Sequence, residues 1–108
     1  MTNEKKNTFT NAQKKYLRKL GHQLSPVVYI GKEGLAPSVV EAIDEALHHH
    51  ELIKIKLINT DKISKHEAAE QVPVLTGGTL VQLIGKTLLV YRKNKKKKKD
   101  TQIRLPTS

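Results

Sequence analysis

The sequence contains no cysteine and no tryptophan, and its aromatic residues are one phenylalanine and three tyrosines in 108 positions. Without cysteine, neither a disulfide framework nor a metal site built on thiolates can form. No apolar run approaches the ~20 residues that a membrane-spanning helix needs. The first residues are polar and charged and lack the apolar stretch of a signal peptide. We therefore expect one domain, located in the cytoplasm and not associated with a membrane.

The aromatic residues are too few to suggest a surface on which bases stack. Proteins that read single strands in that way array aromatic side chains on an exposed sheet. Tyr29 and Tyr91 fall in apolar, strand-like segments, and we predict that both lie in the core. This composition favours contacts with a phosphate backbone over contacts with bases, and such binding depends strongly on salt.

Positive charge is in large excess, with 20 basic against 10 acidic residues. Seven of the basic residues lie close together, namely Arg92, Lys93 and Lys95–Lys99. A run of this kind is typical of a solvated, disordered segment with non-specific affinity for polyanions. We therefore divide the chain into a flexible lead over residues 1–9, a folded domain over residues 10–92, and a lysine-rich tail over residues 93–108.

Hydrophobic periodicity predicts an α/β domain of order α-β-α-β-α-β-β with a small, mixed, four-stranded sheet. The predicted helices cover residues 11–20, about 36–50 and 61–75, and the predicted strands cover residues 27–30, 52–58, 79–84 and 87–91. Strands separated by helices should pair in parallel, and Gly85-Lys86 should join the last two strands in a type II′ hairpin turn. Because several strands are apolar on both faces, we expect helices on both sides of the sheet. Pro73 should kink the third helix or end it at Val72.

The first helix should present a basic face that contains no acidic residue. Its members are Lys14, Lys15, Arg18 and Lys19. Such a face can be ordinary solvated surface, but a purely structural helix often carries acidic partners four residues away. Their absence favours contact with a polyanion. Lys54 and Lys56 alternate with apolar residues, so they should project together from one face of a strand.

The segment Gly31-Lys32-Glu33-Gly34 stands between a strand and a helix. Two glycines allow the backbone to bend sharply and to approach a ligand closely. The helix that follows directs free N–H groups and the positive end of its dipole toward the loop. On a basic protein this arrangement predicts a phosphate-binding loop.

Motifs for catalysis or for metal binding are missing. Gly85-Lys86-Thr87 lacks the glycine that a P-loop needs five positions earlier, where Leu80 stands. The consecutive His48-His49-His50 cannot converge on one ion from one helix face, and no acidic cluster completes a site. No serine lies in a nucleophile motif. We therefore expect a protein that is not an enzyme and that uses neither a cofactor nor a metal ion.

Four separated segments, in order, carry a family resemblance. They are Gln13 to Leu20, Pro26 to Leu35 (PVVYIGKEGL), His49 to Lys56 (HHELIKIK) and Val81 to Arg92 (VQLIGKTLLVYR), followed by a short matching end from Ile103 to Pro106. Together they resemble the CRM domain (chloroplast RNA splicing and ribosome maturation) family in its small, bacterial, YhbY-like form. Two features depart from the family pattern: Pro73 interrupts a helix, and the Lys95–Lys99 run is denser than usual.

The resemblance implies a fold similar to the C-terminal domain of a bacterial translation initiation factor. It also implies RNA binding through the Gly31–Gly34 loop, by analogy with the loop of KH domains, and association with precursors of the large ribosomal subunit. Gly31, Lys32 and Gly34 are carried over as loop residues. The basic helix, Lys54, Lys56 and Lys86 are added from charge and geometry.

We therefore predict a monomeric RNA-binding protein that contacts ribosomal RNA during assembly of the large subunit. The predicted RNA-binding residues are Gly31, Lys32, Glu33, Gly34, Lys14, Lys15, Arg18, Lys19, Lys54, Lys56, Lys86 and Arg92. The alternative is an adaptor for protein partners, which would dock them on the acidic face of the second helix. Its lysine tail would bind any polyanion.

Overall fold

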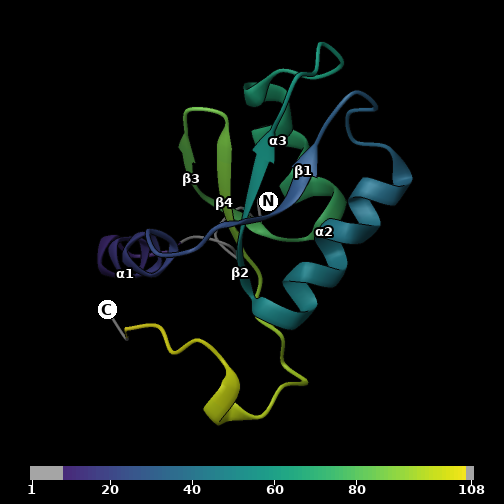
Figure 1. Cartoon of the computed structure of the whole chain (residues 1–108). Helices are drawn as coiled ribbons and strands as arrows, with labels where there is room; N and C mark the ends of the chain where they lie inside the picture. The colour runs from purple at the N-terminus through teal and green to yellow at the C-terminus, as the bar shows by residue number, and fades with distance from the viewer. Residues whose placement is uncertain (1–8, 107–108) are drawn as a thin grey trace, which may run out of the picture.

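In the computed structural model, which describes residues 9–106, helices cover both faces of a four-stranded mixed sheet (Figure 1). The elements are α1 (Asn11–Gly21), β1 (Pro26–Ile30), α2 (Pro37–His50), β2 (Leu52–Leu57), α3 (Lys65–Thr76), β3 (Thr79–Ile84), β4 (Thr87–Tyr91) and the short 3-10 helix η2 (Lys99–Thr101). The predicted order and fold class are confirmed. Within the described residues, no helix is long and apolar enough to cross a membrane.

The strand order is β1-β2-β4-β3, with β1 and β2 parallel and the other two pairs antiparallel. Parallel pairing across a helix is therefore confirmed for β1 and β2 only. β3 runs in the same direction as β2, but β4 lies between them. β4 takes the inner position because nearly all its side chains are apolar and buried, which suits a strand covered on both faces. Gly85 has a φ of 58° and Lys86 does not have a positive φ, as a type II′ turn requires.

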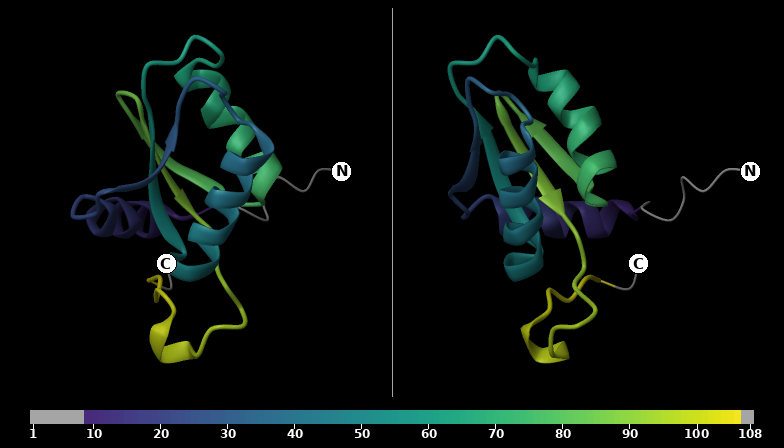
Figure 2. Two further views of the ribbon diagram at one scale, coloured as in Figure 1. Left: turned by 45° about the vertical axis from the view of Figure 1, so that its right-hand side comes forward. Right: turned by 90° about the vertical axis from the view of Figure 1, so that its right-hand side faces the viewer.

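Helices α2 and α3 cover one face of the sheet, and α1 crosses the other face. In the right-hand view of Figure 2, α2 lies in front of the strands and α1 behind them, running across the strand direction. The larger core cluster lies on the α2 side and includes Ile43, Ile55 and Val90. The smaller cluster lies under α1 and is built from Leu17, Leu52, Leu89 and Tyr91. The predicted coverage of both faces is confirmed.

A capping box begins α1. Gln13 donates its backbone N–H to the Thr10 hydroxyl, and Thr10 donates its own to Gln13 Oε1, each over 3.0 Å. At the other end, a Cβ on Gly21 would lie 2.6 Å from the Leu89 side chain. A glycine there lets the end of the helix rest directly on β4. Phe9, assigned to the flexible lead by the sequence, packs instead edge-to-face on Tyr91 with ring centroids 5.7 Å apart. Residues 1–8 of that lead lie outside the described residues.

The prediction for α3 was wrong at the start of the helix and in the alternative that the helix ends at Val72. The helix begins at Lys65 rather than Asp61, because Ser64 and Glu67 form a second capping box. That pattern, a serine followed three residues later by a glutamate, was readable in the sequence. The helix also continues through Pro73 to Thr76. Less than one turn of helix follows Pro73, so few helical hydrogen bonds lie beyond the proline. Gly77 then ends the helix in a left-handed conformation with a φ of 77°.

The C-terminal segment is packed against the domain, where a solvated tail was predicted. Glu51, which is fully buried, accepts hydrogen bonds from the backbone N–H groups of Asn94 and Ile103, both over 2.7 Å. Ile103 and Leu105 pack against the core cluster under α1. Figure 1 shows the segment crossing below the sheet and returning toward α1. A buried carboxylate must be paired, and the chain satisfies Glu51 with its own C-terminal backbone.

The burial of this carboxylate leads to a stability prediction. Replacing Glu51 by alanine leaves two backbone donors without their acceptor, and we expect a loss of about 3 kcal/mol in the free energy of unfolding. Urea denaturation of Glu51→Ala beside Glu45→Ala measures it. Glu45 is exposed on α2, so the control removes the same charge at a cost below about 0.5 kcal/mol. Equal losses in the two variants would show that the carboxylate does not hold the C-terminal segment.

Candidate functional site

Charge is divided between the two faces of the molecule. No acidic residue lies in α1 or in any of the four strands, which together carry six basic residues: Lys14, Lys15, Arg18, Lys19, Lys54 and Lys56. The helices on the opposite face carry five of the ten acidic residues, with Glu41, Asp44 and Glu45 in α2 and Glu67 and Glu70 in α3. The side of the sheet that α1 crosses is therefore the basic side.

The structure brings Lys54 and Lys56 to the same side as α1. Their neighbours Ile53 and Ile55 belong to the core under α2 and α3, so the alternation along β2 turns the lysines to the other face. Three basic residues of α1, together with His22, line a hollow against Gln82 and Ile84 of β3. The basic members of this hollow are Lys15, Arg18 and Lys19. The helix and strand lysines thus border one open region, here called the open face.

The open face also exposes apolar side chains. Tyr29 is 49% exposed and Ile84 is 48% exposed. The prediction that Tyr29 is buried was therefore wrong, whereas Tyr91 is buried as predicted. β1 is an edge strand, and α1 packs on β2 and β3, so the outer half of the face is left uncovered. Burial, with a smaller effect of nearby Glu51, raises the pKa of Tyr91 to about 12.

The Gly31–Gly34 loop forms a tight turn at the end of β1. Gly34 donates its N–H to the carbonyl of Gly31 over 3.0 Å. Gly34 is buried with a φ of 65°, and a Cβ there would lie 3.1 Å from Lys62 Cβ. Gly31 has open space around it, and Lys32 and Glu33 are exposed. The first glycine therefore leaves the backbone accessible, and the second is required by the fold.

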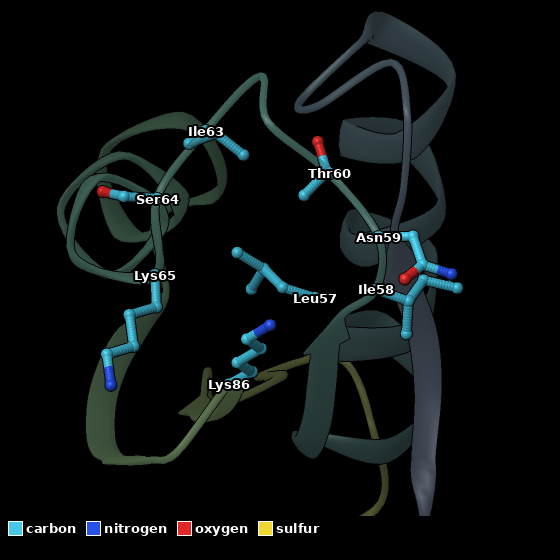
Figure 3. A pocket seen from close by; sticks show the side chains of 8 residues that line it. All are labelled: Leu57, Ile58, Asn59, Thr60, Ile63, Ser64, Lys65 and Lys86. Atoms are coloured by element: carbon cyan, nitrogen blue, oxygen red, sulfur yellow. The ribbon is translucent and has the colours of Figure 1, made fainter.

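Two further connections lie at the same end of the sheet as this loop (Figure 1). They are the segment between β2 and α3 and the hairpin turn with Lys86, whose carbonyl accepts a hydrogen bond from Leu57 N over 2.9 Å. Between them is a pocket of about 250 Å³, lined by Leu57, Ile58, Asn59, Thr60, Ile63, Ser64, Lys65 and Lys86. Figure 3 shows the Lys86 side chain beside Leu57 in this pocket. Nothing in the sequence of the β2–α3 connection had indicated a pocket.

Arg92 lies at the opposite end of β4 and has structural partners. Its guanidinium forms an ion pair with the Asp44 carboxylate, donates to the Thr76 carbonyl over 2.7 Å, and donates to the Asp44 carbonyl over 3.0 Å. These bonds tie β4 to α2 and to the end of α3. Arg92 is therefore not brought together with the other predicted RNA-binding residues, and we assign it to the fold.

Among the described residues, no three histidine, aspartate or glutamate side chains are placed to hold a metal ion. His48 Nδ1 instead lies 3.3 Å from the side-chain nitrogen of Asn94. The α1 side and the loop end present lysines, glycine backbone and exposed apolar groups, a surface that suits binding of an anion.

The two loop glycines should respond differently to substitution. We expect Gly34→Ala to lose about 1–3 kcal/mol of unfolding free energy, because alanine is strained at that φ, and Gly31→Ala to lose less than about 0.5 kcal/mol. Thermal or urea unfolding measures both. Gly31→Ala is then the variant with which to probe the loop in binding assays. A large loss of stability in Gly31→Ala would contradict the open environment described for it.

Arg92 should matter for stability and not for ligand binding. We expect Arg92→Ala to lose about 1–2 kcal/mol of unfolding free energy, since three charge-assisted bonds are removed at a partly exposed site. Lys93→Ala removes the same charge at an exposed neighbour and should leave stability unchanged. Urea denaturation and RNA titration of both variants provide the comparison. An Arg92→Ala protein of normal stability with weaker RNA binding would overturn this assignment.

Comparison with known proteins agrees with this architecture. The CRS1/YhbY (CRM) domain model matches residues 9–92. An RNA-binding protein of Haemophilus influenzae is 38% identical over 99 residues, which cover 92% of this chain and 96% of the relative. A probable RNA-binding protein of Bacillus subtilis, YqeI, is 36% identical over 97 residues, which cover 90% of this chain and 98% of the relative.

A solved structure shows the same fold. The solution structure of a hypothetical Staphylococcus aureus protein, for which RNA binding has been suggested, superposes with a TM-score of 0.73 at 37% identity and covers 92% of this chain and 100% of that one. The predicted family is thereby confirmed: this chain belongs to the CRS1/YhbY (CRM) domain family.

Proposed function

We propose that this protein binds RNA on the open face and the adjoining loop end of the sheet, and that its target is ribosomal RNA in precursors of the large subunit. The observation that carries the proposal is the division of charge. All six basic residues of α1 and the strands occur without a single acidic residue in those elements. Lysine and arginine that neutralise phosphates supply most of the sequence-independent affinity for nucleic acids.

The opposite face supports the same orientation. The exposed acidic residues of α2 repel a phosphate backbone, so RNA is steered away from α2 and toward α1. A protein with charge spread evenly over its surface would have no such preference. The positive charge of α1 and the strands is therefore concentrated on one side of the sheet.

The loop end extends the open face. Gly31 follows Tyr29 by two residues, which is about 7 Å along an extended strand. A strand of RNA that lies over Lys56 can therefore reach the half-buried Gly31 backbone and the Lys32 side chain without leaving the protein surface. Lys86 and Lys65, which line the neighbouring pocket, add positive charge at the same end. Gly31, Lys32, Lys86 and Lys14 remain predicted contacts, and Lys65 is added to them.

RNA is proposed rather than another polyanion because the relatives of this chain are described as RNA-binding proteins. The large-subunit precursor is proposed from the resemblance to the small, bacterial, YhbY-like members of the family. We assign binding, not catalysis, as the activity.

The adaptor alternative rests on a different surface. Leu75 is 52% exposed and borders a hollow with Glu41 and Asp44 on the α2 side. A protein partner docked there would leave the lysines of residues 93–98 to hold any polyanion. The two hypotheses therefore place RNA affinity on different lysines.

Two matched triple variants separate these hypotheses. The first is Lys15→Gln, Lys19→Gln and Lys56→Gln on the open face, and the second is Lys95→Gln, Lys96→Gln and Lys98→Gln on the C-terminal segment. All six side chains are exposed, and both variants remove three charges. Titrating a ribosomal RNA fragment over a salt series, we expect the first variant to bind more weakly, with a log–log slope shallower by about 2.

The second variant should keep most of the affinity. Substitution is preferable to truncation at Arg92, because truncation removes the backbone partners of Glu51. Loss of affinity in the second variant alone would favour the adaptor hypothesis. Co-sedimentation of the full chain with large-subunit precursors, and its loss in the first variant, tests the ribosomal part. Co-sedimentation of the intact protein with mature subunits alone would contradict that part.

A further inference from the structure

The part of the open face that α1 leaves uncovered carries a row of side chains across all four strands. Tyr29 of β1 pairs with Lys56 of β2, and Lys56 pairs in turn with Thr87 of β4. Thr87 then pairs with Ile84 of β3. Because neighbouring strands lie about 4.8 Å apart, the row is about 14 Å long. Its two ends are apolar and exposed, and its middle is polar and positively charged.

We propose that this row is a stacking platform for unpaired bases of single-stranded RNA, with the Tyr29 ring against one base and the Lys56 ammonium beside the adjoining phosphate. The proposal rests on the proposed RNA-binding function and specifies which chemical part of the RNA the open face contacts. Lysines alone would bind only the backbone.

The exposure of Tyr29 is the first argument. About half of its surface faces solvent on a strand whose alternate side chains, Val28 and Ile30, are buried in the core. Val27, on the same side of β1 as Tyr29, is also 51% exposed. Neither α2 nor α3 lies on this side of the sheet (Figure 2). The flat face of a base is an occupant that can cover such a ring, and stacking of this kind accepts any base.

Charge decides between a base and an apolar protein partner. Lys56 stands next to Tyr29 in the row, Lys54 lies on the same side of β2, and the basic residues of α1 border the other end at Ile84. No acidic residue of α1 or the strands neutralises them. The occupant must therefore combine apolar flat groups with negative charges at short intervals, as single-stranded RNA does. In a duplex the base faces are already stacked, so paired RNA cannot use the platform.

The test compares two probes and two substitutions. The probes are a short oligouridylate and an RNA hairpin with the same number of phosphates, whose two strands are joined by a non-nucleotide linker so that every base is paired. Tyr29→Thr removes the ring and keeps a residue that favours strands, whereas Tyr29→Phe keeps the ring. We expect Tyr29→Thr to weaken oligouridylate binding by about 5- to 100-fold, the effect of losing one base–aromatic stack. The salt slope should not change, because no phosphate contact is lost. Tyr29→Phe should bind within about twofold of the intact protein.

Controls make the result specific. Val74→Thr removes an apolar side chain that is 82% exposed on α3, on the far side of the sheet, and should leave binding unchanged. Hairpin binding should also be unchanged in Tyr29→Thr. Because the chain has no tryptophan, Tyr29→Trp introduces a single reporter, and its emission should be quenched by oligouridylate and not by the hairpin.

Three results would overturn the stacking platform. Unchanged oligouridylate affinity in Tyr29→Thr would show that the ring makes no contact, while leaving the RNA-binding proposal intact. Equal losses for both probes would show that Tyr29 shapes the surface without stacking. Self-association of the intact protein that Tyr29→Thr abolishes would make the row an interface between two copies of the chain. If the intact protein binds neither probe nor a ribosomal RNA fragment, the proposed function itself fails.

Discussion

One helix of eleven residues has to cover a whole face of a four-stranded sheet. Such a helix is about 16 Å long, and it crosses the strands instead of running along them (Figure 2). The opposite face has two helices and is closed, with a continuous apolar core beneath them. The α1 face is closed where Leu17 and Leu20 of α1 reach the sheet, together with Phe9 and the C-terminal segment. The open face is the part of the sheet that α1 leaves uncovered, and the proposed function depends on it.

The chain completes the closed part of this face with its C-terminal segment. Ile103 and Leu105 add to the small core beside α1, and the Gln13 side chain donates to the Pro106 carbonyl over 2.8 Å. Buried Glu51 holds the path of the segment through two backbone bonds. Lys95, Lys96 and Lys98 are consequently exposed on a segment that is packed against the domain. They belong to the surface of the fold, although they lie beyond the part of the chain that the family model matches.

Charge and topology act together on the open face. The same alternation that buries Ile53 and Ile55 under α2 turns Lys54 and Lys56 toward the α1 side. The amphipathic character of α1 buries Leu17 and leaves its basic residues at the rim of the face. Acidic residues are concentrated in the two helices that cover the other side. A small domain thereby has one face suited to a polyanion and another that repels it.

Local signals accounted for the elements and for much of the basic surface. The capping box at Thr10, the glycine in the β3–β4 turn and the alternation of Lys54 and Lys56 act over a few residues, so they could be read directly. The start of α3 at Ser64 was equally readable and was missed. The continuation of the helix through Pro73 could not be read from the sequence. It depends on the packing of the last turn and on Gly77, whose backbone N–H donates to the Pro73 carbonyl.

The sequence by itself determined the order of elements, the basic character of α1 and the glycine loop, since each follows from short-range periodicity and charge. Only the tertiary structure decided which apolar residues are exposed and which basic residues form ion pairs within the fold. Tyr29 lies in an apolar segment and is nevertheless half-exposed, because β1 is an edge strand that α1 does not cover. Arg92 is basic and yet engaged, because the fold brings Asp44 and Thr76 to it from distant positions. The burial of a side chain and the ion pairs of a charged residue depend on neighbours that are far away in the chain, so local sequence patterns cannot predict them.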